Sequence, residues 1–177
     1  TNYFRARDFS YPTRIDNPHL TLEPGMQYIM DGVADRGSGV LPHRVVFTVT
    51  DLTKVINGVR SVVMWDRDYN NEVLSEAELA FFAQDDDGNI WTMGEYPEEY
   101  ENGEFLGAPS TWIAGLGGAE AGILVPGPSR LGFHFLQGWA PEVNFLDCGT
   151  VYTIGGSTCS PFGCYENVLV IDEWSPL

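Results

Sequence analysis

The chain has 177 residues, 44% hydrophobic and 13% aromatic, which suits one packed domain and excludes a disordered chain. Its 9 basic and 25 acidic residues give a net charge of −16, which disfavours nucleic acid and anionic membranes as partners. No apolar run approaches the roughly 20 residues of a spanning helix, so the sequence predicts no membrane span.

The first 25 residues are predicted to form an extended arm, because they contain three prolines that a central strand would not accept. Phe9, Ile15 and Leu20 make this arm too apolar for a free tail. We expect it to fold across its own domain, residues 26–177, since burial within a chain avoids the entropy cost of association. The alternative is self-association, with the N-terminal arm pairing against a neighbouring molecule.

Beyond the arm, apolar and polar residues alternate with a period of two, and amphipathic helix periodicity is almost absent. Residues 72–84 fit either a strand or a short helix by composition, and their position between two turn signals favours a strand. The expected strands are 26–31, 43–50, 54–67 with a break at Asn57-Gly58, 72–84, 89–96, short pieces near 110–114 and 122–126, 132–137, 144–154 and 165–174.

Turns are predicted at Asn57-Gly58, Asn70-Asn71 and Asp87-Gly88, where residues that tolerate positive φ separate alternating runs. Strands joined in this way pair with their neighbours in the sequence. The predicted fold class is therefore all-β, an antiparallel meander forming a barrel or a sandwich, with an extended N-terminal arm.

The acidic stretch at 85–87 invites comparison with a calcium loop. Such a loop needs ligands at positions 1, 3 and 5, glycine at 6 and a bidentate glutamate at 12. With Gly88 at position 6, Asp85 and Asp87 fall at positions 3 and 5, but Ala83 and Gly94 occupy positions 1 and 12. We therefore predict an acidic turn, with no metal site and no cofactor.

The chain has three cysteines and none of the paired spacings of zinc or haem sites. Cys159 and Cys164 bracket a short loop, and a hairpin there would bring their Cα atoms within bonding range. We predict a disulfide between these two residues and a reduced Cys148. Disulfides are typical of exported proteins, so the chain is predicted to be a mature secreted protein without its signal peptide.

Four segments of the sequence resemble segments of exported proteins. IDNPHLTLEPGMQYIMDG, TDLTKVINGVRSVVMWDRDY, FFAQDDDGNIWTMGE and FGCYENVLVIDEWSPL occur in this order. They resemble IDNPYFPLKPG, TKVIAGVRAVVVRDR, AQDKDGNVWYFGE and FENVLVTKEWTPL of an uncharacterised family of secreted bacterial β-rich proteins. The resemblance implies an exported, calycin-like domain and supplies no catalytic residues. This chain departs from the family pattern in its cysteines and in lacking a final strand after Trp174-Ser175-Pro176-Leu177, which would leave an open sheet edge.

Carboxylates on one face are the candidates for catalysis. Glu76 and Glu78 lie two residues apart and share a face if 72–84 is a strand, and Glu95 can join them from the next strand. Buried there, they would have raised pKa values and could serve as acid and base; the alternative is a solvated outer face. His134 is a further candidate, although a lone histidine on an alternating strand is more often structural.

Three functions from different classes follow. The first is a non-catalytic binding module for a small apolar or carbohydrate ligand, with Trp65, Phe82, Trp91 and Trp112 as candidate binding residues. The second is an extracellular structural subunit that assembles by strand or arm exchange. The third is an enzyme that uses inward-facing carboxylates.

Overall fold

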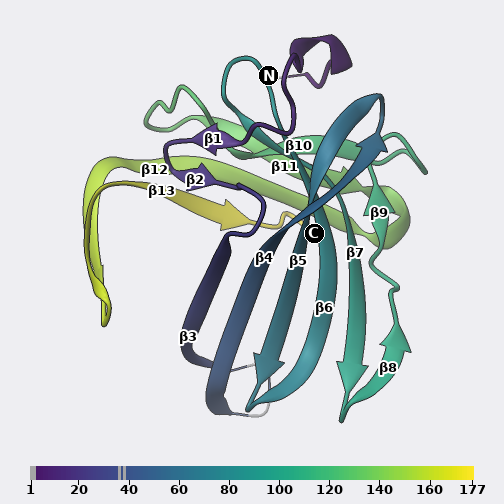
Figure 1. Ribbon diagram of the computed structural model, residues 1–177, viewed down its shortest axis with the longest axis vertical. Coiled ribbons are helices and arrows are strands. Elements are labelled where there is room, and N and C mark those ends of the chain that lie inside the picture. The colour runs from purple at the N-terminus through teal and green to yellow at the C-terminus, as the bar shows by residue number, and fades with distance from the viewer. Residues whose placement is uncertain (1–2, 36, 38) are drawn as a thin grey trace.

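The computed structural model describes residues 3–35, 37 and 39–177, and it is almost entirely β-structure (Figure 1). Two 3-10 turns, η1 (Ala6–Asp8) and η2 (Pro141–Val143), accompany the strands. The strands are β1 (Asp16–Asn17), β2 (Leu20–Thr21), β3 (Gln27–Asp35), β4 (Val40–Ile56), β5 (Val59–Asn70), β6 (Val73–Gln84), β7 (Ile90–Glu101), β8 (Glu104–Gly107), β9 (Trp112–Ile113), β10 (Glu120–Val125), β11 (His134–Ala140), β12 (Phe145–Ser160) and β13 (Gly163–Trp174).

One antiparallel sheet holds all strands except β1 and β2, in the order β13-β12-β11-β10-β7-β6-β5-β4-β3, with β8 and β9 paired to β7. The sheet curls into a half-barrel whose two edge strands, β3 and β13, do not pair with each other within the described residues (Figure 1). The predicted all-β antiparallel fold is confirmed, and the ambiguous segment 72–84 is the strand β6.

The observed turns show how well local sequence signals predicted their positions. Asn57 and Gly58 have φ of 47° and 83° and join β4 to β5 directly, as predicted for this pair. The next turn lies one residue later than predicted, with positive φ at Asn71 and Glu72. A register shift follows it, because Asp68 pairs with Glu76 whereas Tyr69 pairs with Leu74.

Two hydrophobic clusters lie on opposite faces of the same long strands. Val63 belongs to the first cluster and the adjacent Val62 to the second, and they are only 5% and 3% exposed. The first cluster includes Phe81, Trp91 and residues of β10–β12. The continuous apolar run 62–64 arises because both faces of the strand are covered, as in buried parallel sheets.

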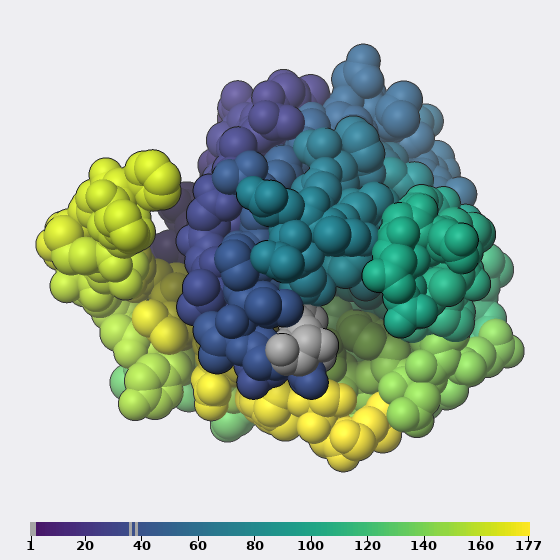
Figure 2. Space-filling view, turned by 90° about the horizontal axis from the view of Figure 1, so that it is seen from below, coloured from purple at the N-terminus to yellow at the C-terminus, as the bar shows by residue number. Residues whose placement is uncertain are grey.

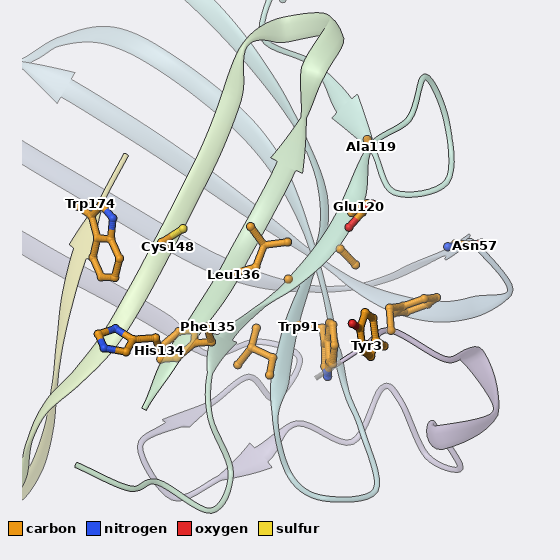
Figure 3. A pocket seen from close by; sticks show the side chains of 14 residues that line it. Tyr3, Asn57, Trp91, Ala119, Glu120, His134, Phe135, Leu136, Cys148 and Trp174 are labelled. Atoms are coloured by element: carbon orange, nitrogen blue, oxygen red, sulfur yellow. The ribbon is translucent and has the colours of Figure 1, made fainter. Parts of the chain in front are cut away.

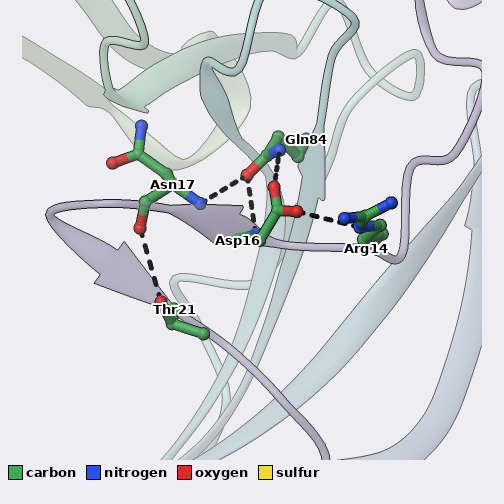
Figure 4. A network of polar contacts seen from close by, with 5 residues as sticks. All are labelled: Arg14, Asp16, Asn17, Thr21 and Gln84. Atoms are coloured by element: carbon green, nitrogen blue, oxygen red, sulfur yellow. Dashed lines mark hydrogen bonds and ion pairs between the residues drawn. The ribbon is translucent and has the colours of Figure 1, made fainter.

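Residues 3–25 include η1 and the small β1–β2 hairpin, and they pack against the end of β6 (Figure 4). The Gln84 side chain accepts hydrogen bonds from the backbone N–H groups of Asp16 and Asn17, both at 3.0 Å, and donates one to the Asp16 carboxylate at 2.8 Å. Ile15 and Leu22 are each 2% exposed and join the second cluster. Part of this segment is therefore buried against its own sheet, and the extended arm predicted for residues 1–25 is not confirmed.

The strands β12 and β13 form a long hairpin whose tip projects from the sheet (Figures 1 and 2). Cys159 and Cys164 are directly paired near its tip and form the predicted disulfide, while Cys148 is free. Among the described residues, no helix has the length and apolar character needed to cross a membrane.

Candidate functional site

Acidic side chains from three neighbouring strands share one face of the sheet. Asp66 on β5 pairs directly with Glu78 on β6, and Glu95 on β7 pairs with Ala80, two residues from Glu78. Direct partners in an antiparallel pair have Cβ atoms about 5 Å apart and diagonal neighbours about 7 Å. We call the acidic residues of this region the carboxylate face: Asp66, Glu76, Glu78, Glu95 and Asp147.

Burial changes the protonation of two of these residues most strongly. Burial, together with the nearby carboxylates of Glu95, Glu76 and Asp66, raises the pKa of Glu78 from 4.5 to about 9. Burial also raises the pKa of Asp66 to about 7, assisted by the charges of Glu76 and Asp68. At neutral pH Glu78 is therefore protonated, whereas Asp66 is close to half ionised.

Glu95 lies on β7, beside the short strand β9 and near β12. Burial raises its pKa, and the negative charge of Asp147 on β12 acts in the same direction. The indole Nε1 of Trp112 donates a hydrogen bond of 3.1 Å to a Glu95 oxygen and opposes this shift. Gly94 allows the contact, because a Cβ at this position would lie 2.6 Å from the Trp112 carbonyl oxygen as β9 pairs with β7.

Asp147 connects the carboxylate face to the C-terminal segment. Burial raises its pKa, the nearby Ser175 hydroxyl lowers it, and Glu173 on β13 adds a like charge. β5 ends and β6 begins at the lower end of the sheet in Figure 1, and Figure 2 views that end from below. There the surface is hollowed between the teal strands and the yellow C-terminal residues.

The predicted catalytic candidates fall into two places. Glu76 and Glu78 share a face, as their spacing predicted, and Glu95 joins them. Sequence reasoning missed Asp66 and Asp147, since their positions depend on the pairing of β5 and on the approach of β12. His134 lies apart on β11, where its Nδ1 is 2.7 Å from the Thr150 hydroxyl.

The acidic turn at 85–89 uses its carboxylates as internal hydrogen-bond acceptors. Asp85 accepts bonds from the backbone N–H groups of Asp87 and Asn89 and, at 2.8 Å, from the Trp91 indole. Asp86 accepts two bonds of 2.9 Å from Ser10. Within the described part of the chain, no group of three or more acidic, histidine or cysteine side chains is arranged to hold a metal ion.

A second candidate site is a cavity of about 600 Å³ between the N-terminal residues and strands β10–β13 (Figure 3). Aromatic rings from both sides contribute to its wall together with aliphatic residues, and Asn57, Glu120 and Cys148 add polar groups. Trp174 is 41% exposed, and the edge of its ring meets the His134 ring with centroids 6.1 Å apart. We call this site the aromatic groove: Tyr3, Phe4, Trp91, His134, Phe135 and Trp174.

Of the predicted ligand-binding aromatics, only Trp91 lines this groove, and Phe4 packs against it with ring centroids 5.8 Å apart. Phe82 and Trp112 are 5% and 4% exposed and belong to the hydrophobic clusters. Trp65 is 40% exposed on another part of the sheet, with the Arg67 guanidinium 4.1 Å above its ring. Trp174 and Phe135 carried no sequence signal that separated them from core aromatics.

Together these features define an open antiparallel half-barrel that has a partly buried carboxylate face and a separate aromatic groove. Comparison of the chain with protein-family models, with curated proteins and with solved structures found no match. A function for this protein must therefore be argued from the two sites themselves.

Proposed function

We propose that the protein is a non-catalytic binding module whose aromatic groove takes a small ligand with an apolar ring face, either a carbohydrate or a compact apolar molecule. The observation that carries this proposal is the groove itself. Its volume of about 600 Å³ lies within the range of small-molecule sites, about 300–1,000 Å³. Its wall is mainly apolar, made of aromatic and aliphatic side chains, with a few polar groups among them.

The chemistry of the wall supports this class of ligand. A ring face packs against an aromatic side chain such as Trp174, while His134 and Asn57 supply hydrogen-bonding groups for hydroxyls. Glu120 adds one negative charge to the wall, and among the residues that the structure describes no Lys or Arg lines it. An anionic ligand is therefore disfavoured in a protein of net charge −16.

Binding measurements with a matched pair of variants test the proposal. We would screen mono- and oligosaccharides and small apolar compounds by calorimetry and tryptophan fluorescence. Trp174→Ala is expected to weaken binding of a hit at least about tenfold, or about 1.4 kcal/mol. Trp65→Ala removes a tryptophan of nearly equal exposure, 40% against 41%, from outside the groove and should leave affinity unchanged. Equal losses in both variants would refute the groove as the binding site.

The carboxylate face favours a second candidate function, acid–base catalysis. Protonated Glu78 and the more acidic Asp66 face each other across β5 and β6, and carboxyls whose pKa values are driven apart are the usual acid and base of hydrolases. In that case Glu78→Gln and Asp66→Asn would each abolish hydrolysis of a chromogenic glycoside or ester and leave ligand binding in the groove intact. Hydrolysis that survives both substitutions would reject this role.

We also propose that the protein acts outside the cytoplasm. A disulfide between Cys159 and Cys164 persists in an oxidising compartment and is rare in reducing ones. Detection of the oxidised protein in culture medium, with none in the cell lysate, would support secretion.

A further inference from the structure

The outer half of the β12–β13 hairpin is separated from the rest of the sheet by a bend. Gly155 and Asn167 both have positive φ, 71° and 59°, and the β12–β13 register shifts on both sides of Gly156. Beyond this point the hairpin turns away from the sheet, and Figures 1 and 2 agree that its tip stands clear of β3. We call residues 157–166 the distal hairpin.

The distal hairpin and the strand that leads into it are exposed and carry aromatic side chains, with Glu166 as the one charged residue of the distal hairpin. Residues 148–165 contain no charged side chain, in a chain of 9 basic and 25 acidic residues. Phe162 at the tip is 85% exposed, Tyr165 53% and Tyr152 69%. An isolated two-stranded hairpin is marginally stable in water, and here the Cys159–Cys164 disulfide holds it together.

The opposite edge strand of the sheet, β3, is also exposed and partly apolar. Strand β3 pairs only with β4, so the N–H and C=O groups along its outer side have no strand partner among the described residues. Ile29 is 56% exposed, Met30 45% and Val33 70%. This strand has no bulge and contains neither lysine nor proline, and Asp31 and Asp35 are the charged side chains that could protect it from pairing.

We propose that the distal hairpin packs against β3 of a second copy of this chain, and that the second copy returns the same contact in a two-fold homodimer. In such an isologous interface each copy supplies one hairpin and one β3 edge. Extension of an exposed sheet edge by an added strand is an established mode of association between proteins. The inference is independent of the proposed ligand in the aromatic groove.

Charge favours a second copy over other occupants. Two copies of net charge −16 repel each other least where the approaching surface carries little charge, and Glu166 is the one charged residue of the distal hairpin. The receiving strand carries two acids. The Asp31 carboxylate is held by Arg44 in two hydrogen bonds of 2.6 and 3.1 Å, and the Asp35 carboxylate accepts hydrogen bonds from the backbone N–H groups of Gly37 and Gly39. A cationic partner would instead be drawn to the acidic body of the protein and would gain little from a hairpin with a single charge.

The test is the mass of the intact, oxidised protein in solution, measured by sedimentation and light scattering across micromolar concentrations. The wild type is expected to be a dimer. Phe162→Glu and Val33→Glu, one on each side of the contact, should each weaken the dimer at least tenfold. Leu131→Glu also places a charge on an apolar residue. Leu131 is 71% exposed and lies outside the distal hairpin and β3, so this variant should remain dimeric. Circular dichroism of each variant separates loss of the contact from loss of the fold.

Other results would overturn the proposal. A monomeric wild type at the highest concentration would show that the copies do not pair. A dimer that survives Phe162→Glu would place the contact elsewhere, and a dimer lost equally in Leu131→Glu would show a general effect of added charge. Slower hydrogen exchange in 27–35 and 157–166 on concentration would support the proposed pairing, whereas unchanged exchange in a dimer would contradict it.

Discussion

Replacing Glu78 by glutamine should make the protein more stable at neutral pH and flatten its pH dependence. The folded state raises the pKa of Glu78 from 4.5 to about 9, chiefly because the carboxyl is buried beside other acids. Below pH 4.5 both folded and unfolded chains hold the proton. As the pH rises from 4.5 to 9, the unfolded chain releases the proton and the folded chain keeps it, so stability falls throughout this window.

The magnitude follows from about 1.4 kcal/mol for each pH unit inside the window. Between pH 5 and pH 7 Glu78 alone should therefore lower the free energy of unfolding by up to about 3 kcal/mol. Glutamine keeps the shape of the protonated acid and does not titrate, so it removes this contribution. Asp66, whose pKa of about 7 is also raised, still titrates in the variant, and its contribution cancels when the two proteins are compared.

The assay is urea unfolding followed by tryptophan fluorescence at pH 5, 6, 7 and 8, in the wild type and in Glu78→Gln. The stability difference between them should widen in favour of the variant as the pH rises. Glu104→Gln, at an exposed position on β8, controls for the loss of one negative charge from the chain. Parallel curves for wild type and Glu78→Gln across the whole range would refute the raised pKa.

The remaining predictions concern the cysteines, the acidic turn and the core. Thiol labelling of unreduced protein, unfolded in denaturant, should find one reactive cysteine, Cys148. After reduction it should find three, and three before reduction would contradict the disulfide. Asp85→Ala should lower the unfolding free energy by about 2–3 kcal/mol, because four N–H donors lose their acceptor, and calorimetry should detect no tight calcium binding in either protein. Met93→Ala should cost about 3 kcal/mol, since Met93 is fully buried, while Leu131→Ala at an exposed site should change stability by less than about 0.5 kcal/mol.

Local features of the chain could be predicted from its sequence because their causes are local. Asn57-Gly58 fixes its own turn, and a period of two places Glu76 and Glu78 on one face whatever the rest of the chain does. The disulfide was predicted for the same reason, since a short loop limits where Cys159 and Cys164 can lie.

The rest depended on pairing that spacing cannot specify. A register shift between Phe81 and Phe82, where β6 pairs with β7, sets which side chains of β7 face each cluster. That shift, together with the approach of β12, brings Asp147 near Glu95. The aromatic groove draws Tyr3, Phe135 and Trp174 from distant parts of the chain, so no window of sequence contains it.

The hydrogen bonds between the Gln84 side chain and residues 16 and 17 have a consequence for the order of folding. Most strand pairs in the sheet join consecutive strands, so hairpins can form one after another with short loop closures. The N-terminal residues are synthesised before the sheet, yet their partners Gln84 and Asp86 lie 67 to 76 residues downstream. This segment therefore has no docking surface until β6 and β7 have formed. We expect it to dock in a late kinetic phase and to exchange its amide hydrogens before the central strands do.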